Sequence, residues 1–177
     1  MKTEITKRML VAFLAVFMVS TGLLAQDKSS RPSPPATAKG MIGDATVTVD
    51  YSSPAVKGRK IWGDLVPYGK AWRAGANEAT ILETDKDLKI KGKTLPAGKY
   101  SLFATPGEKK WEIILNSETG QWGVKRGGEA NRDPAKDVLK VMVKAKKADM
   151  HERLTYEVNK KGIALMWDKV SVQIPAK

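Results

Sequence analysis

The chain has 177 residues, a formal net charge of +12, no cysteine and a single histidine, His151. Without cysteine there is no disulfide, thiolate zinc site, iron–sulfur cluster or thiol nucleophile, so stability must come from packing and backbone hydrogen bonding. A single histidine leaves any metal site to carboxylates, and no calcium-loop spacing occurs. No G-x-S-x-G elbow or intact phosphate loop is present either. We therefore expect no metal and no cofactor.

The positive charge is compatible with nucleic acid, acidic glycans or an anionic membrane surface as partners. The lysines, however, are spread along predicted strands instead of forming one block. This distribution favours a solubilising surface, and we expect no nucleic-acid partner. The alternative is a structural or interaction protein whose basic faces meet anionic envelope polymers.

Residues 1–25 have the pattern of a secretory signal peptide. Three basic residues precede an apolar run that begins at Met9 and continues, with small breaks, to about Leu24. Ala25 is a small residue that suits the position before cleavage. Because the apolar run is short for a bilayer-spanning helix, an uncleaved anchor is the less favoured alternative. We expect a periplasmic or secreted protein with no stable membrane anchor after signal cleavage.

Residues 26–43 are rich in proline and serine, which indicates an extended entry segment. A single domain is expected to follow over residues 44–177. The strict alternation over 44–51 predicts a half-buried strand, and weaker alternation recurs over 79–91. Residues 98–116 predict a hairpin, since Pro106-Gly107 fits the central pair of a type II turn.

The second half continues the strand pattern. Residues 138–147 and 154–158 alternate between apolar and polar side chains, as do 163–167 and 170–174. The parity of the alternation changes around Asp168, which predicts a bulge or a strand bending between sheets. About nine short strands with two long connections favour an all-β fold. An antiparallel β-sandwich is the expected architecture, with a small β-barrel as the alternative.

The connection from Ser52 to Asn77 is the strongest candidate for a functional segment. Long connections without regular structure are uncommon in compact domains and are usually functional or wrapped on the core. This one combines aromatic rings with cationic and amide groups, the residue types that stack sugar rings or hold anions. The candidate ligand-binding residues are Arg59, Trp62, Tyr68, Trp72, Arg73, Asn77 and Glu78.

Two other interpretations of the same segment stay open. Trp62 and Trp72 could plug one end of the domain, with the arginines paired to acidic groups. Asp64 and Glu78 could form a carboxylate pair for glycoside-type acid–base catalysis, which would make the protein a hydrolase. Trp111 and Trp167 lie within predicted strands, and we expect both in the core.

The motifs YSSP, GRKIWG, VPYG, WRAGANE and LPAG lie between Tyr51 and Gly98, and WEIILN follows at Trp111–Asn116. Together they make the chain resemble a bacterial family, domain of unknown function 2911 (DUF2911), over nearly all of the segment after the signal. The resemblance implies an exported bacterial protein with a β-rich domain, and it brings no assigned catalytic residues. We expect a non-catalytic binding or envelope-associated module for a carbohydrate or small anionic ligand.

Overall fold

A computed structural model describes residues 28–177, so the expected signal peptide lies outside the described residues. Within this range the chain forms nine β-strands and one short 3-10 turn, η1 (Pro134–Lys136), but no α-helix. No helix of this part of the chain is long and apolar enough to cross a membrane.

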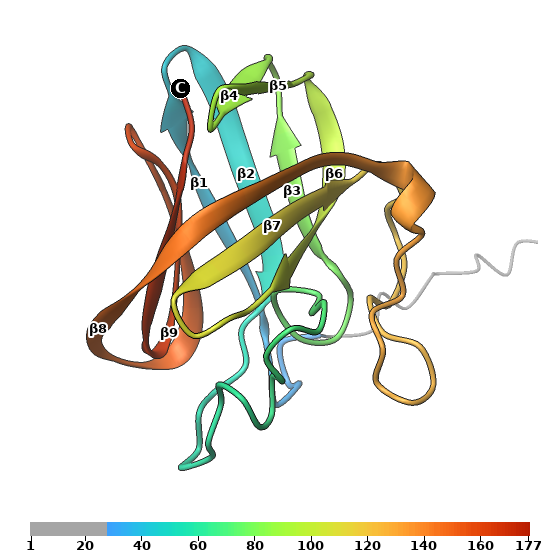
Figure 1. The fold of residues 1–177 in the computed structure, drawn as a ribbon, viewed down its shortest axis with the longest axis vertical. Coiled ribbons are helices and arrows are strands. Elements are labelled where there is room, and N and C mark those ends of the chain that lie inside the picture. The colour runs from blue at the N-terminus through green and yellow to red at the C-terminus, as the bar shows by residue number, and fades with distance from the viewer. Residues whose placement is uncertain (1–27) are drawn as a thin grey trace, which may run out of the picture.

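Seven of the strands form one antiparallel sheet, in the order β1-β2-β3-β6-β7-β8-β9, and the other two form a separate β4-β5 ribbon (Figure 1). Each hydrogen-bonded neighbour pair runs antiparallel. The strand bounds are β1 (Pro35–Ile42), β2 (Ala45–Ser52), β3 (Thr80–Thr84), β4 (Leu88–Ile90), β5 (Lys93–Leu95), β6 (Gly98–Thr105), β7 (Lys110–Asn116), β8 (Asp137–Asn159) and β9 (Gly162–Pro175).

The large sheet curls until its two ends nearly meet. The first part of β8 pairs with β7 and the rest pairs with β9, so this 23-residue strand crosses the whole front of the molecule in Figure 1. Beyond β2, Ala55 forms a bridge to Arg153 on β8. The predicted all-β antiparallel fold of about nine strands is confirmed. The large sheet is curled into a nearly closed barrel, which brings the structure close to the small β-barrel that was the alternative architecture.

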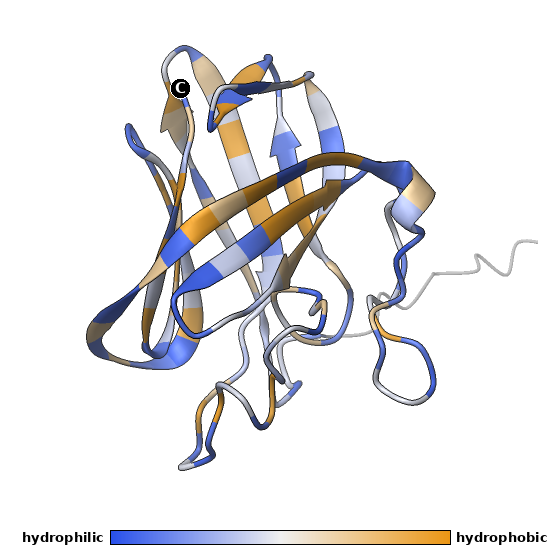
Figure 2. Ribbon diagram, in the orientation of Figure 1, coloured by the Kyte–Doolittle hydropathy of each residue, from blue (hydrophilic) through white to orange (hydrophobic). Residues whose placement is uncertain are grey.

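Alternating side chains build the core inside this curled sheet. On β2, Ala45, Val47 and Val49 are buried because successive residues of a strand point to opposite faces. Stripes of hydrophobic residues follow the strands in Figure 2. The largest fully buried side chains include Trp111, Trp167 and Phe103, so the expected core positions of both tryptophans are confirmed.

Two segments differ in extent from the sequence-based prediction. Eight residues of the extended entry segment form β1, an edge strand that begins at Pro35, where a missing backbone N–H is tolerated. The two strands predicted over 138–147 and 154–158 are one continuous strand, β8. Register shifts around His151 let β8 bend without ending. The irregularity predicted at Asp168 is confirmed, since Asp168 pairs with His151 there and has a φ of +54°.

Candidate functional site

The first half of the Ser52–Asn77 connection contains a tight turn over residues 61–66 that places Trp62 in the core. The Val66 amide donates to the Ile61 carbonyl at 2.9 Å, and the Gly63 amide donates to the Val66 carbonyl at 3.0 Å. Gly63 has a φ of +83°, and a Cβ there would lie 2.9 Å from the Tyr68 ring. Glycine is therefore required for Tyr68 to pack over the turn.

The second half is fixed to β6 through Trp72. The Trp72 amide donates to the Ala104 carbonyl at 2.8 Å, and the Ala104 amide donates back to the Trp72 carbonyl at 2.9 Å. The indole Nε1 of Trp72 donates to the Gly75 carbonyl at 3.0 Å. Both the backbone and the side chain of Trp72 are thus held in place.

Four tryptophans meet beneath this connection. Trp62 contacts the other three, with ring centroids 4.7 Å from Trp111, 5.6 Å from Trp167 and 5.9 Å from Trp72. Trp62, Trp111 and Trp167 are buried, whereas Trp72 is half-buried. The tryptophan cluster (Trp62, Trp72, Trp111, Trp167) therefore belongs mainly to the core and reaches the surface at Trp72.

Two indole N–H groups of this cluster have no hydrogen-bond partner among the described residues. They are the Nε1 groups of Trp62 and Trp167, both shielded from solvent. A buried donor left without an acceptor costs about 1–3 kcal/mol. Buried polar groups without a partner are uncommon in folded proteins.

A groove of about 820 Å³ opens where the tryptophan cluster meets the surface. It lies between the Ser52–Asn77 connection and residues 124–134, with Trp72 and Trp167 among its lining residues. Four cationic side chains also line it, against the single carboxylate of Glu129. They are Arg59, Lys70, Arg73 and Arg132. We call this space the tryptophan groove.

Arg59 and Arg73 are oriented by neutral carbonyls. Arg59 donates from Nη2 to the Ala55 carbonyl at 2.5 Å and from Nε to the Val56 carbonyl at 3.1 Å. Arg73 donates from Nη1 to the Trp122 carbonyl at 3.2 Å, and its guanidinium lies 5.9 Å from the centroid of the Trp122 ring.

Neither arginine forms an ion pair with a carboxylate within residues 28–177. Burial lowers the pKa of Arg73, and the charge of Glu78 partly offsets this effect. A guanidinium nevertheless stays protonated near neutral pH. The tryptophan groove is therefore lined by two guanidinium groups that have no ion-pair partner in the described part of the chain, although the charge of Glu78 acts on Arg73 from a greater distance.

The opposite wall of the groove is anchored by a buried carboxylate, Asp137. It is paired with Arg132 and with Lys140 Nζ at 2.8 Å, and it accepts a hydrogen bond from Asn116 Nδ2 at 2.8 Å. Burial opposes ionisation of Asp137, but the hydrogen bonds from Arg132, Lys140 and Asn116 outweigh it and lower the pKa. This network fixes the end of the second long connection. Because Arg132 is paired with Asp137, its charge is less available to a ligand than the charges of Arg59 and Arg73.

Asn77 and Glu78 face the entry segment. Asn77 Nδ2 donates to the Ser33 carbonyl at 2.9 Å, and Glu78 pairs with Lys28 at 2.9 Å and Arg31 at 3.0 Å. Burial by itself would raise the pKa of Glu78. Hydrogen bonds from Lys28, the backbone and Arg31 lower it to about 2 instead. Both residues hold the segment before β1 against the connection.

The structure gathers only part of the predicted site. Among the candidate ligand-binding residues, Arg59, Trp72 and Arg73 line the tryptophan groove, and the others do not. Trp62 lies beneath it, and Tyr68 packs over the turn. Sequence reasoning did not assign Arg132 or Trp167 to the site.

The candidate carboxylate pair gains no support from the geometry. Asp64 is exposed, and neither Asp64 nor Glu78 lines the tryptophan groove. With a pKa of about 2, Glu78 is ionised near neutral pH and is a poor proton donor there. Residues 28–177 contain no group of three histidine, cysteine or carboxylate side chains placed to hold a metal ion.

The fold and the groove define a small, nearly barrel-shaped β-domain with a cationic, tryptophan-walled opening. A family profile described as a protein of unknown function, DUF2911, matches residues 33–176, and the chain belongs to this family. No curated protein and no solved structure matches the chain significantly.

Proposed function

We propose that this protein is an exported, non-catalytic binding module that holds a small anionic ligand, such as an acidic sugar, in the tryptophan groove. Export rests on the signal-like pattern of residues 1–25. The observation that carries the ligand class is the pair of arginines, Arg59 and Arg73, that line the groove together with Trp72. Both are oriented by carbonyls, and neither has an ion pair with a carboxylate within residues 28–177.

The groove suits such a ligand in size and chemistry. Its volume of about 820 Å³ falls in the range of small-molecule sites, about 300–1,000 Å³. An indole edge or face supplies apolar contact to a sugar ring, while guanidinium groups donate charge-assisted hydrogen bonds to a carboxylate or phosphate. Envelope association would follow if the anionic group belongs to a surface glycan.

The test is calorimetric titration of the mature protein with uronic acids, matched neutral sugars and simple anions. Uronic acids should bind more tightly than neutral sugars, and the affinity should fall as salt is added, because screening weakens the charge term. Arg59→Gln and Lys70→Gln should each weaken binding. Lys60→Gln is the matched control, because Lys60 is an exposed lysine of the same connection that does not line the groove.

Equal weakening of binding by Lys60→Gln and Lys70→Gln would mean that only the net charge of the protein matters. That result would contradict a site in the groove. Binding of neutral and acidic sugars with equal affinity would contradict the anionic class. Failure of every acidic and neutral probe to bind would favour the purely structural alternative.

A further inference from the structure

A second cavity lies at the point where strands β8 and β9 separate. The two strands are paired from Ala145 and Val172 toward the hairpin that joins them. Before Ala145, β8 stays with β7. The end of β9 turns to the β4-β5 ribbon instead, where the Lys91 amide donates to the Pro175 carbonyl at 3.3 Å. The separation leaves a pocket of about 490 Å³ that shares no lining residue with the tryptophan groove.

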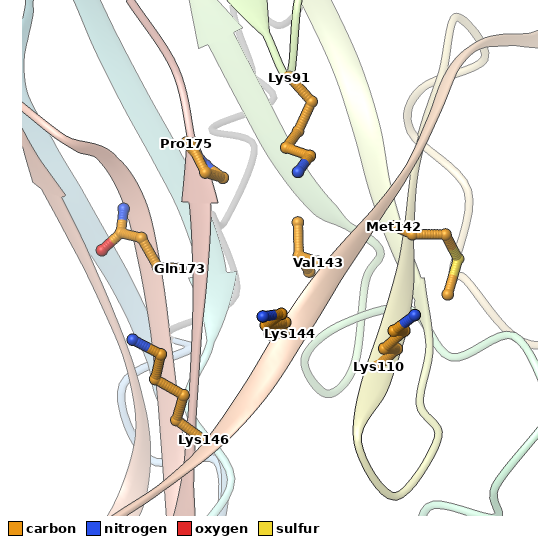
Figure 3. A pocket seen from close by; sticks show the side chains of 8 residues that line it. All are labelled: Lys91, Lys110, Met142, Val143, Lys144, Lys146, Gln173 and Pro175. Atoms are coloured by element: carbon orange, nitrogen blue, oxygen red, sulfur yellow. The ribbon is translucent and has the colours of Figure 1, made fainter.

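Four lysines surround this pocket. Lys91 comes from the turn between β4 and β5, Lys110 from β7, and Lys144 and Lys146 from β8. Figure 3 shows Lys91 reaching toward Val143, with Lys144 on the other side of that residue. We call this space the lysine pocket.

The remaining lining is largely apolar. Val143 belongs to the hydrophobic core, and Met142 and Pro175 are exposed beside it. Gln173 is the one uncharged polar side chain of the lining. The lysine pocket therefore combines a positive rim with an apolar base that reaches the core.

No carboxylate balances this rim. The lining contains no aspartate or glutamate, and none of the four lysines forms an ion pair with a carboxylate in residues 28–177. Glu112 lies two residues from Lys110 on β7, opposite Met142, but within residues 28–177 it forms no ion pair with any of the four lysines.

Lys110 and Lys144 are, in addition, direct cross-strand partners in the β7–β8 register. Like charges placed directly opposite each other destabilise a sheet, so this arrangement works against folding in the absence of an anion. An anion bound between the two ammonium groups would attract both of them and so offset their mutual repulsion.

We propose that the lysine pocket binds a phosphate ester, with the phosphate against the lysine rim and the apolar substituent against Val143 and Pro175. Lysine ammonium groups bind phosphate as point charges and need no fixed fork geometry. The pocket volume is in the range of small-molecule sites. A soluble ester and a lipid headgroup share this chemistry, and the experiment separates the two sources.

The test uses hexyl phosphate, inorganic phosphate and phosphatidylcholine vesicles with and without phosphatidic acid, each with the mature protein. Hexyl phosphate should bind more tightly than inorganic phosphate, because only the ester has an apolar part. The double variant Lys110→Gln/Lys144→Gln should bind hexyl phosphate about tenfold more weakly, since two charges beside the phosphate are lost. Without any anion, its melting temperature should equal or exceed that of the wild type, because the like-charge pair is removed.

The matched control is Lys39→Gln/Lys160→Gln, which makes the same change in net charge at two exposed lysines outside the pocket. Its affinity for hexyl phosphate should stay that of the wild type. Vesicle binding that needs both phosphatidic acid and the pocket lysines identifies a lipid source, and binding of the soluble ester alone identifies a free ester. Equal losses in the two double variants, or no binding of any phosphate probe, would overturn the proposal.

Discussion

The indole rings of Trp72 and Trp167 stack with their centroids 5.9 Å apart and 19° between their planes. Trp167 is buried at 1% exposure, Trp72 is half-buried, and both line the tryptophan groove. The wall of the groove is therefore continuous with the hydrophobic core. A ligand against Trp72 would contact a ring that the core itself holds in position, so packing and binding roles coexist at this residue.

Trp72→Ala is expected to lower the free energy of unfolding by about 2–4 kcal/mol. The value lies below the cost of about 3–5 kcal/mol for a fully buried tryptophan, because one side of Trp72 faces the groove. Trp72→Phe should recover part of the loss, since a smaller ring still covers Trp167. Urea unfolding followed by circular dichroism measures both variants.

The control for this change is Trp122→Ala. Trp122 is 49% exposed, and its ring lies beside the Arg73 guanidinium. Loss of an exposed cation–π contact should cost about 0.5–1 kcal/mol. If Trp72→Ala costs no more than Trp122→Ala, then Trp72 does not support the core.

Most of the fold could be predicted from the sequence because alternation is a local signal. The strand around Val47 shows it clearly, and the change of parity at Asp168 marked a real irregularity. The continuity of β8 could not be predicted. Alternation is lost where the strand bends near His151, although backbone pairing persists there. The short strand β5 also carries too few residues for a pattern.

The site was harder to predict, because its members come together only through strand pairing. Arg59, Trp72 and Arg73 were found from composition, since they lie in one connection. Trp167 has the strand pattern of a core residue, and it is one. Its second role in the groove wall depends on how Trp72 docks on β6. Arg132 belongs to the second long connection, whose position no local pattern indicates.

Glu78→Gln is expected to loosen the segment before β1. The carboxylate pairs with Lys28 and Arg31, and the amide cannot replace both charge-assisted bonds. Hydrogen exchange of the amides near Pro34 should become faster. The control Glu83→Gln makes the same change in net charge, removes the exposed pair with Lys99 on β6 and should leave this exchange unchanged.

The same carboxylate gives a pH dependence of defined sign. The pKa of Glu78 falls from its ordinary value of 4.5 to about 2 in the folded protein. The stabilisation of the folded protein by the ionised Glu78 carboxylate is thus complete above about pH 4.5 and is lost as the pH falls toward 2. Because the side chain is 37% exposed, solvent screening limits the contribution to about 1 kcal/mol or less. Unfolding free energies of wild type and Glu78→Gln should converge as the pH falls, and a constant difference would contradict the ion-pair role.

Gly40→Ala is expected to open the contact between β1 and β8. A Cβ at Gly40 would lie 2.5 Å from the Val158 carbonyl oxygen, closer than such atoms approach without displacement. Overpacking of this kind costs about 1–3 kcal/mol. Lys39→Ala, at the exposed neighbouring position, should have a much smaller effect on the melting temperature. Equal effects of the two changes would mean that β1 moves freely away from β8.

Asp137→Asn is expected to lower the free energy of unfolding by about 2–3 kcal/mol at neutral pH, because the hydrogen bonds of Arg132 and Lys140 lose their charged acceptor. Asp133→Asn is the control, since an exposed N-cap accepts asparagine as readily as aspartate. Because Asp137 has a lowered pKa in the folded protein, its contribution is complete above its unfolded value near 3.8 and disappears as the pH falls through the folded value.

Asp137→Asn and Asp133→Asn are to be compared by urea unfolding from neutral to acidic pH, and by titration with a uronic acid at neutral pH. Asp137 lies behind the groove wall and is not among the groove-lining residues. Asp137→Asn should therefore weaken ligand binding by loosening Arg132, with a smaller loss than Arg59→Gln, whose guanidinium lines the groove directly. If Asp137→Asn is as stable as Asp133→Asn at neutral pH, the buried network does not anchor this wall.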